Sequence, residues 1–314
     1  MLERLEIVVG GHRQAAMPTA PVLSSLSSPW KGFVLEQHEL PPLEMPDHWI
    51  PYHMVNVGLV QLPQKQFWFE DGRERYQDMR SGFVSLVSPR EIRRLRWERS
   101  ARMIAVGIEP ETMRNIVPDS LHGRDVELMM QVGGDDPLLK TLIFALQTEL
   151  AAGCPGGPLY GESLCTWLAI GMMEKYSVAR IRLDQYKGGL AKPQLKRLLD
   201  YIDSFPEQNL TLDQLARLAG LSRFHFLRAF KHSTGSTVHR YVLSRRLWRA
   251  QELLVKPGSS LVEVASATGF SSQSHFTAVF TARNGISPGA YRARSTRQMV
   301  LAPSERDSVT LAAP

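Results

Sequence analysis

The sequence of 314 residues has few cysteines and no long apolar run, and its acidic residues do not outnumber its basic ones. Cys154 and Cys165 are its two cysteines, and neither lies in a Cys-x-x-Cys or Cys/His pattern. This excludes a disulfide framework and predicts buried, reduced thiols. The longest apolar stretches, such as 103–108 and 167–173, are too short to span a bilayer. No signal-peptide core follows the charged N-terminus, so we expect a cytoplasmic protein with no membrane partner.

Composition and charge indicate two or more folded domains, one of them basic. With 43% hydrophobic and 22% charged residues, the chain can bury ordinary cores, which excludes global disorder. Residues 191–300 contain 16 Lys and Arg against 6 Asp and Glu, a net charge of +10. Residues 1–190 contain 20 against 23, a net charge of −3. This segregation predicts a polyanionic partner, most often nucleic acid, for the C-terminal third.

The pattern along the chain predicts an α+β multidomain protein. Residues 1–30 are rich in Pro, Ser and Ala and are expected to form a flexible lead-in. Residues 31–110 contain short β-branched, aromatic or alternating segments separated by turns, typical of an antiparallel β-sandwich or barrel. Apolar stripes then predict helices over 138–150 and 162–176, a pair that would form either a lid or a dimer seam. We expect a linker over 177–192 and a flexible tail over 296–314.

The basic third contains an internal repeat. His225-Phe226, Phe230, Gly235 and Tyr241 recur as the same residue types displaced by 50 positions. Residues 211–214 and 260–263 each have the form of a capping box before a short apolar helix. Gly220 and Gly269 would turn the chain into a second helix. Each copy is therefore predicted to be a helix–turn–helix unit.

A second helix held in this way can place its outer face in the major groove of DNA. The positions expected to contact DNA are Arg223, Phe224, Leu227, Arg228 and Lys231 in the first copy, and Ser272, Gln273, Ser274 and Thr277 in the second. Arg223 and Arg228 are expected to pair with guanine, and Gln273 with adenine or a phosphate. Phe224 and Leu227 either read a thymine methyl group or are ordinary surface residues. Arg240 and Arg245 either contact phosphate or are solvated. His225 and His275 adjoin core Phe residues, which favours a structural role.

The segment between the two copies sets their spacing. Residues 237–255 are predicted to form one helix, ended by Pro257-Gly258. About eighteen steps of about 1.5 Å give a rigid spacer of roughly 27 Å. With the offset of each unit added, the two recognition helices would reach successive major grooves, about 34 Å apart.

These residues resemble the DNA-binding domain of the AraC/XylS family of bacterial transcription regulators over residues 193–293, about a third of the chain. The resemblance is carried by Leu215-Ala216, Gly220-Leu221-Ser222, Phe230-Lys231, Gly235, Arg246-Leu247, Ala250, Leu253-Leu254, Gly269-Phe270, Ser274-His275-Phe276, Phe280, Pro288 and Tyr291-Arg292. It implies a domain of seven helices over about 193–295, with two helix–turn–helix units joined by a central helix. Ala278 departs from the family, where this outward position is often basic or polar, so base contacts by the second helix are less expected.

The resemblance also implies a function for residues 31–176, which are similar to the cupin-like sensory half of many such regulators, followed by a helical pair that often dimerises. This more diffuse similarity rests on Glu39-Leu40-Pro41-Pro42, Pro46-Asp47-His48, Trp68, Asp71-Gly72 and Gly82. A small-molecule effector would bind in the barrel mouth. His48, His53, Trp68 and Trp97 are candidate effector contacts, although the aromatic residues fit a core better than a pocket.

The competing interpretation is a cupin-type metalloenzyme carrying an accessory DNA-binding region. His38, His48 and His53 are close in sequence, but no His-x-His pair with a nearby Glu accompanies them. A metal needs several converging ligands, so we expect no metal, no cofactor and no enzymatic activity. The other alternative is an architectural protein that binds DNA of any sequence. The resemblance implies an effector-responsive, homodimeric activator that binds double-stranded promoter or operator DNA, with RNA polymerase as a candidate partner.

Overall fold

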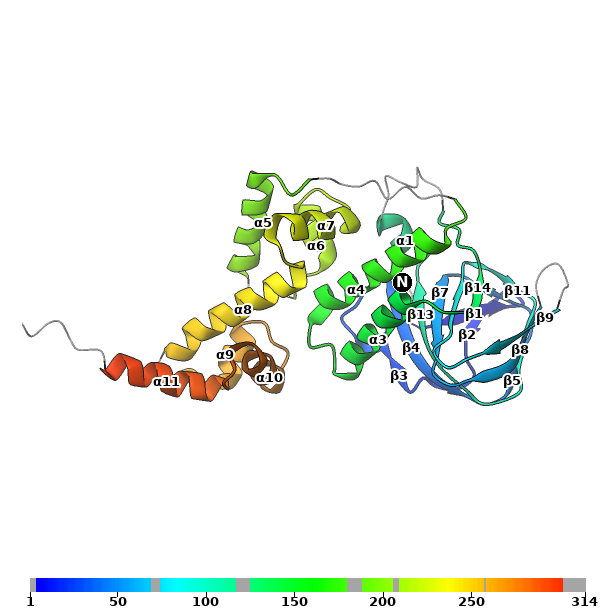
Figure 1. The fold of residues 1–314 in the computed structure, drawn as a ribbon, viewed down its shortest axis with the longest axis horizontal. Helices are drawn as coiled ribbons and strands as arrows, with labels where there is room; N and C mark the ends of the chain where they lie inside the picture. Colours follow the sequence, from blue (N-terminus) through cyan, green and yellow to red (C-terminus); the bar gives the residue numbers. More distant parts are fainter. Residues whose placement is uncertain are drawn as a thin grey trace, which may run out of the picture. The chain divides into compact units, whose positions relative to one another are not determined.

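The structure is a computed structural model that describes residues 4–68, 74–116, 125–179, 188–205, 209–256 and 258–301. The chain divides into two compact units. The first comprises Met1–Leu198 with Asn209–His239, and the second comprises Leu199–Gln208 with Arg240–Pro314. Helices and strands occur together in the first unit and helices in the second, so the prediction of a mixed α and β protein is confirmed (Figure 1).

The described strands of the first unit pair antiparallel in three sheets. The strands are β1 (Glu6–Val9), β2 (His12–Ala15), β3 (Leu23–Ser24), β4 (Phe33–Leu40), β5 (Leu43–Met45), β6 (His48–Ile50), β7 (His53–Gly58), β8 (Leu62–Trp68), β9 (Glu74–Met79), β10 (Val84–Val87), β11 (Arg90–Ile92), β12 (Arg94–Trp97), β13 (Ala101–Ile108) and β14 (Gln131–Gly134). Their orders are β11-β6-β1-β2, β14-β10-β7-β13-β4-β3 and β5-β12-β8-β9. Among these strands no ring of hydrogen bonds closes, so the cupin-like barrel stays a prediction.

The six-stranded sheet is buried on both faces, because its side chains alternate between two apolar cores. Phe33 and Leu35 of β4 pack in one core with residues of the helices, whereas Val34 packs in the other core with residues of β1, β5 and β6. On β13, Ile104 and Ala105 divide between the two cores in the same way. The sheet therefore separates a helix-covered side from a strand-covered side.

The prediction of a flexible lead-in over residues 1–30 is wrong for residues 4–30. Residues 6–15 form a hairpin of β1 and β2, and Leu5 and Ile7 are buried in the strand-covered core. Gly10 and Gly11 connect the strands, both with positive φ, as a two-residue hairpin turn requires. The run Ile7-Val8-Val9 before this Gly-Gly pair was the signal for it in the sequence.

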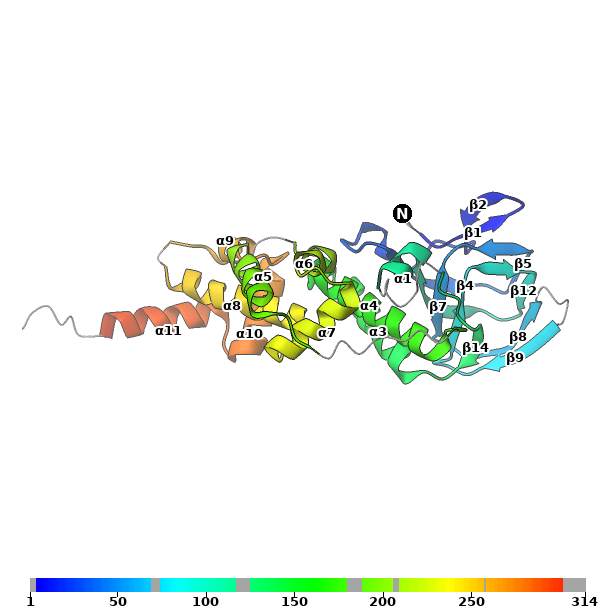
Figure 2. The ribbon, with the colours of Figure 1, turned by 90° about the horizontal axis from the view of Figure 1, so that it is seen from above.

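The helices of the first unit begin with α1 (Pro110–Ile116), α3 (Pro137–Ala151) and α4 (Gly157–Tyr176). The predicted helical pair is thus confirmed as α3 and α4, with α4 starting five residues earlier than expected (162 to 157). The two helices lie side by side and pack together (Figure 2). Helix α3 also contacts β3 and β13. The remaining helices here are α5 (Lys192–Ser204), whose residues from Leu199 belong to the second unit, α6 (Leu212–Leu218) and α7 (Arg223–Thr234).

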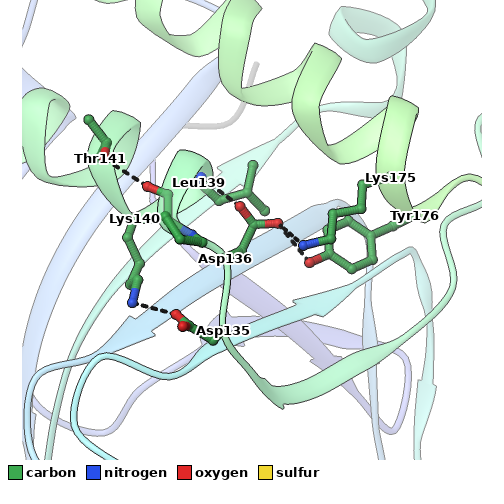
Figure 3. Close-up of polar contacts among 8 residues, drawn as sticks. Asp135, Asp136, Leu139, Lys140, Thr141, Lys175 and Tyr176 are labelled. Atoms are coloured by element: carbon green, nitrogen blue, oxygen red, sulfur yellow. Dashed lines mark hydrogen bonds and ion pairs between the residues drawn. The ribbon is translucent and has the colours of Figure 1, made fainter.

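One buried carboxylate ties the start of α3 to the end of α4 (Figure 3). Asp136 is the N-cap of α3, where its Oδ1 accepts a hydrogen bond from the Leu139 N–H at 3.1 Å. Its Oδ2 accepts from Lys175 Nζ and from the Tyr176 hydroxyl, each at 2.8 Å. Burial raises the pKa of Asp136, but these three hydrogen bonds outweigh it, so the pKa lies below its usual value. The carboxylate therefore stays charged while only 4% exposed.

The second unit is formed by most of α8 (Val238–Val255), with α9 (Leu261–Ala267), α10 (Gln273–Asn284) and α11 (Pro288–Leu301). The predicted single helix over 237–255 is confirmed by α8. Leu247 and Leu254 of α8 pack with Phe276 and Phe280 of α10 in one apolar core. Residues 296–301, predicted as part of a flexible tail, are helical, and the rest of that tail lies outside the described residues. The other domain boundaries stay predictions.

Two sequence expectations concern the whole chain. Cys154 and Cys165 are free and buried, as predicted, and burial raises the pKa of the Cys154 thiol to about 11. Among the helices that the structure describes, none is both long enough and apolar enough to cross a membrane.

Candidate nucleic-acid interface

The first helix–turn–helix unit consists of α6 and α7 and forms through local signals that the sequence carries. Thr211 and Gln214 make a reciprocal capping box, with hydrogen bonds of 3.2 and 3.0 Å. Gly220 turns the chain with a φ of +66°, and Ser222 caps α7 by accepting from the His225 N–H at 3.3 Å. The predicted caps and turn are confirmed at each position.

The second helix–turn–helix unit, which consists of α9 and α10, repeats the same arrangement. Ser260 and Glu263 make its capping box at 3.1 and 2.7 Å, and Gly269 turns the chain with a φ of +76°. Ser272, which we predicted to contact DNA, is the N-cap of α10, and its hydroxyl accepts from the His275 N–H at 3.1 Å. The repeat in the sequence is therefore also a repeat in the structure.

The predicted DNA contacts of the second copy lie at the surface. Ser272, Gln273 and Ser274 are exposed at the start of α10, and Thr277 is half-buried one turn later. Phe276 and Phe280 point to the opposite side and are fully buried. The outer face of α10 thus offers hydroxyl and amide groups that can hydrogen-bond to bases or phosphates.

The outward orientation that we predicted for Phe224 and Leu227 in the first copy is wrong. Phe224 is 0% and Leu227 is 5% exposed. The reason is that α4 packs on this side of α7, where the rings of Trp167 and Phe224 meet edge to face at 6.5 Å. Their contact with DNA stays a prediction, and it would require α7 to leave α4.

The predicted basic contacts of α7 differ in their surroundings. Arg223 is largely buried and donates from Nε to Asp213 Oδ1 at 3.1 Å. The guanidinium of Arg228 lies over the ring of Phe224, 5.3 Å from its centroid, and is half-buried. Lys231 is exposed. Lys231 is therefore the most accessible cation among these three.

The two predicted phosphate contacts of α8 also differ. Arg240 is exposed. Arg245 is half-buried, donates from Nε to Asp203 Oδ1 at 2.6 Å, and lies over the ring of Trp248 at 4.6 Å. A phosphate would have to compete with Asp203 for Arg245, and Arg240 is the more exposed of the two.

The candidate effector contacts whose side chains the structure describes, His48, His53 and Trp97, have different surroundings. His53 is buried, hydrogen-bonds through Nδ1 with Ser88 Oγ at 3.2 Å, and burial lowers its pKa to about 4. Trp97 is buried and donates from Nε1 to the Pro41 carbonyl at 2.9 Å. Trp68 pairs in register with Arg94 in the sheet, but its side chain lies outside the described part of the chain. His48 lines a cavity whose lining contains neither His53 nor Trp97.

This cavity, of about 50 Å³ open to water-sized molecules, lies within the strand-covered core. Most of its lining is apolar, with Met, Ile, Val and Leu side chains. Asn56, which our sequence analysis did not single out, lines it and is 5% exposed, and its Oδ1 accepts no hydrogen bond among the described residues. An orphaned buried acceptor is costly, so this atom fits a donor supplied by a ligand or by water.

The described residues contain no group of three or more His, Cys, Asp and Glu side chains placed to hold a metal ion. His38 instead forms a buried pair with Glu36, at 3.0 Å between Nε2 and Oε2. His48 Nδ1 hydrogen-bonds with the Pro46 carbonyl at 2.7 Å, and burial lowers its pKa. The three histidines thus have separate partners.

Comparison with known proteins places this geometry in a family. Residues 215–294 match the family model described as a helix-turn-helix domain. The transcriptional regulator MtrA of Neisseria gonorrhoeae is 28% identical over 158 residues, which cover 50% of this chain and 52% of that protein. The probable transcription factor PqrA of Proteus vulgaris is 30% identical over 109 residues, which cover 34% of this chain and 89% of that protein. A solved regulator structure from Chromobacterium violaceum, described as AraC-type, is 32% identical over 34% of this chain and 95% of its own, with a TM-score of 0.32.

The chain belongs to the AraC family of transcriptional regulators. The family resemblance inferred from the helix–turn–helix residues is thereby confirmed, whereas the cupin-like N-terminal part stays a prediction. The match spans about half the length of the MtrA regulator. The relatives MtrA of Neisseria gonorrhoeae and GbdR of Pseudomonas aeruginosa are transcriptional regulators, in agreement with the prediction that this AraC-family chain is not an enzyme.

Proposed function

We propose that this protein is a sequence-specific DNA-binding transcriptional regulator that places α7 and α10 in successive major grooves of double-stranded DNA. The observation that carries the proposal is the exposed start of α10, where Gln273 and Ser274 project from a capped helix within a duplicated helix–turn–helix unit. The net charge of +10 on residues 191–300 supplies the attraction to phosphate that such binding needs. The AraC-family membership supports the same function.

The test is selection of duplexes bound by the full chain from a randomised pool, followed by affinity measurement at fixed salt. A selected duplex should bind about 10³-fold or more tightly than its scrambled version. Gln273→Ala should cost about 1–3 kcal/mol of binding free energy and relax the preference at one base pair. Arg240→Ala should instead weaken binding to the selected and scrambled duplexes equally, because a phosphate contact carries no sequence information.

An equal affinity for selected and scrambled duplexes would favour the architectural alternative over sequence-specific regulation. The salt dependence alone would not separate the two, because both kinds of protein neutralise phosphates. The ratio of affinities at one salt concentration is therefore the deciding measurement.

We propose further that the cavity beside Asn56 binds the effector, a small and largely apolar molecule with one hydrogen-bond donor. The apolar lining favours such a ligand, and Asn56 Oδ1, with Tyr52 and His48 also in the lining, can fix its orientation. The test is a thermal-shift screen of small apolar alcohols and amines. Hits should be lost in Asn56→Leu and kept in Trp49→Leu, because Trp49 is 44% exposed and is not part of the lining.

Homodimerisation and activation complete the proposal. Leu138 and Phe144 of α3 are 56% and 39% exposed, an apolar surface that supports α3 as the dimer seam. Light scattering should then give the dimer mass for the full chain and the monomer mass for a variant carrying Leu138→Glu and Phe144→Glu. Transcription from a promoter bearing the selected site, with RNA polymerase added, distinguishes an activator from a repressor.

A further inference from the structure

The two copies of the repeat differ in what covers their outer faces. Ser274 and Thr277 of α10 occupy the positions equivalent to Phe224 and Leu227 of α7, 50 residues earlier. Ser274 is exposed and Thr277 is half-buried, whereas Phe224 and Leu227 are buried. Burial at these positions is thus not a requirement of the helix–turn–helix unit itself. It has a cause outside the unit.

That cause is α4. Phe224 belongs to the apolar cluster that also contains Leu168 and Met172 of α4, and its ring meets that of Trp167 edge to face. Aromatic pairs of this geometry contribute beyond the apolar area that they bury. The core side of α7 carries Phe226 and Phe230. Its other side, which its own helix–turn–helix unit leaves open, is therefore occupied by α4, and α1 also contacts α7.

A polar contact accompanies the apolar one. Glu162 of α4 is 2% exposed, and its Oε2 accepts a hydrogen bond from the Leu212 N–H at the start of α6, at 2.8 Å. The carboxylate lies where the helix dipole favours negative charge. Burial raises the pKa of Glu162, while the Leu212 bond and the charge of Arg223 oppose that rise. Tyr160 of α4 also lies against His239, with ring centroids 4.5 Å apart.

These contacts are suited to opening. A carboxylate regains full hydration when the helices separate, which offsets part of the apolar surface that becomes exposed. A purely apolar seam would have no such compensation. Interfaces between parts of a chain that move are accordingly more polar than permanent cores.

We propose that α4 acts as an autoinhibitory latch, in which Trp167 and Glu162 hold the first helix–turn–helix unit so that Phe224 and Leu227 cannot reach DNA. The inference rests on the proposed function, because it assumes that α7 enters a major groove. In the latched state only the second helix–turn–helix unit presents an uncovered recognition helix. Target binding and latching compete for one face of α7, so each opposes the other.

The test compares the full-length wild type, Glu162→Ala, Trp167→Ala and the control Trp49→Ala on one selected duplex at fixed salt. Trp49 is a tryptophan of β6 that is 44% exposed, similar to Trp167 at 37%. Only the protein molecules whose latch is open bind DNA through both helix–turn–helix units, so the apparent affinity for DNA rises as the latch weakens. Losing a buried hydrogen bond to a carboxylate changes an equilibrium about tenfold or more. Both latch variants should bind about tenfold more tightly than wild type, and Trp49→Ala should be unchanged.

The outcomes separate the two proposals. If no protein binds any selected duplex, the proposed function fails. If all four bind the duplex with the same affinity, the latch is refuted while the function stands. If the α4 variants do not fold, hydrogen exchange of the wild type decides instead: adding the duplex should speed amide exchange in residues 157–176, and unchanged or slower exchange there refutes the latch.

Discussion

The Asp136 network makes the sharpest stability prediction. Replacing Asp136 with alanine removes the N-cap of α3 and leaves the hydroxyl of Tyr176, a residue that is 7% exposed, without its acceptor (Figure 3). The helical pair that α3 and α4 form would then be tied by packing alone at this end. We therefore expect a large loss of stability from a change of one small side chain.

The magnitude follows from the separate contacts. Loss of an N-cap costs about 0.5–2 kcal/mol. Leaving a buried hydroxyl unsatisfied costs about 1–3 kcal/mol. The two effects share one side chain and are not fully additive, so the free energy of unfolding should fall by about 2–4 kcal/mol. Because the pKa of Asp136 is lowered, this stabilisation is present at neutral pH and is lost as the pH falls through the folded-state pKa.

Urea denaturation at pH 7, followed by circular dichroism and Trp fluorescence, measures the loss. The matched control is Asp135→Ala, since the neighbouring Asp135 is exposed and pairs with Lys140 at 2.5 Å. Its cost should stay within about 0.5 kcal/mol. In the Asp136→Ala background, Tyr176→Phe should cost less than it does in the wild type, because its hydrogen bond is already gone. Equal losses for Asp135→Ala and Asp136→Ala would refute the reasoning.

Two further predictions concern pH and backbone conformation. Because burial holds the pKa of His53 at about 4, below its usual 6.5, the unfolded state binds more protons between these values. Acidification from pH 6.5 to 4 should therefore cost roughly 3 kcal/mol of unfolding free energy, and the slope should flatten in His53→Gln; an unchanged slope would contradict the assignment. Gly235→Ala and Gly285→Ala should each destabilise by about 1 kcal/mol, because φ is +70° and +75° and the added methyl group meets no atom within 4 Å. Thermal melts of the three variants measure this, and Gly289→Ala, in α11 without a positive φ, should be neutral or stabilising. An equal loss of stability in Gly289→Ala would show that backbone strain is not the cause.

The predictable features of this molecule are those fixed by residues close together in sequence. Capping boxes, glycine turns and the bounds of α8 depend on contacts within a few residues, and the structure has them where the sequence places them. The hairpin over residues 6–15 was missed although its signal is equally local. A Pro- and Ser-rich neighbourhood hid the Ile7-Val8-Val9 run before Gly10-Gly11.

The site was less predictable, because a periodic pattern identifies a face but not its occupant. Helical spacing correctly separates the side of α7 that carries Phe226 and Phe230 from the side that carries Phe224 and Leu227. It cannot tell whether the second side meets water, DNA or another helix, since that depends on α4, about 50 residues away. One signal was available: Phe and Leu stand on α7 where Ser and Thr stand on α10, and apolar side chains on an outer face suggest a partner. A residue that serves both a latch and a groove must be apolar enough for the first and accessible enough for the second. The sequence difference between the two copies therefore carries regulatory information, rather than a difference in folding.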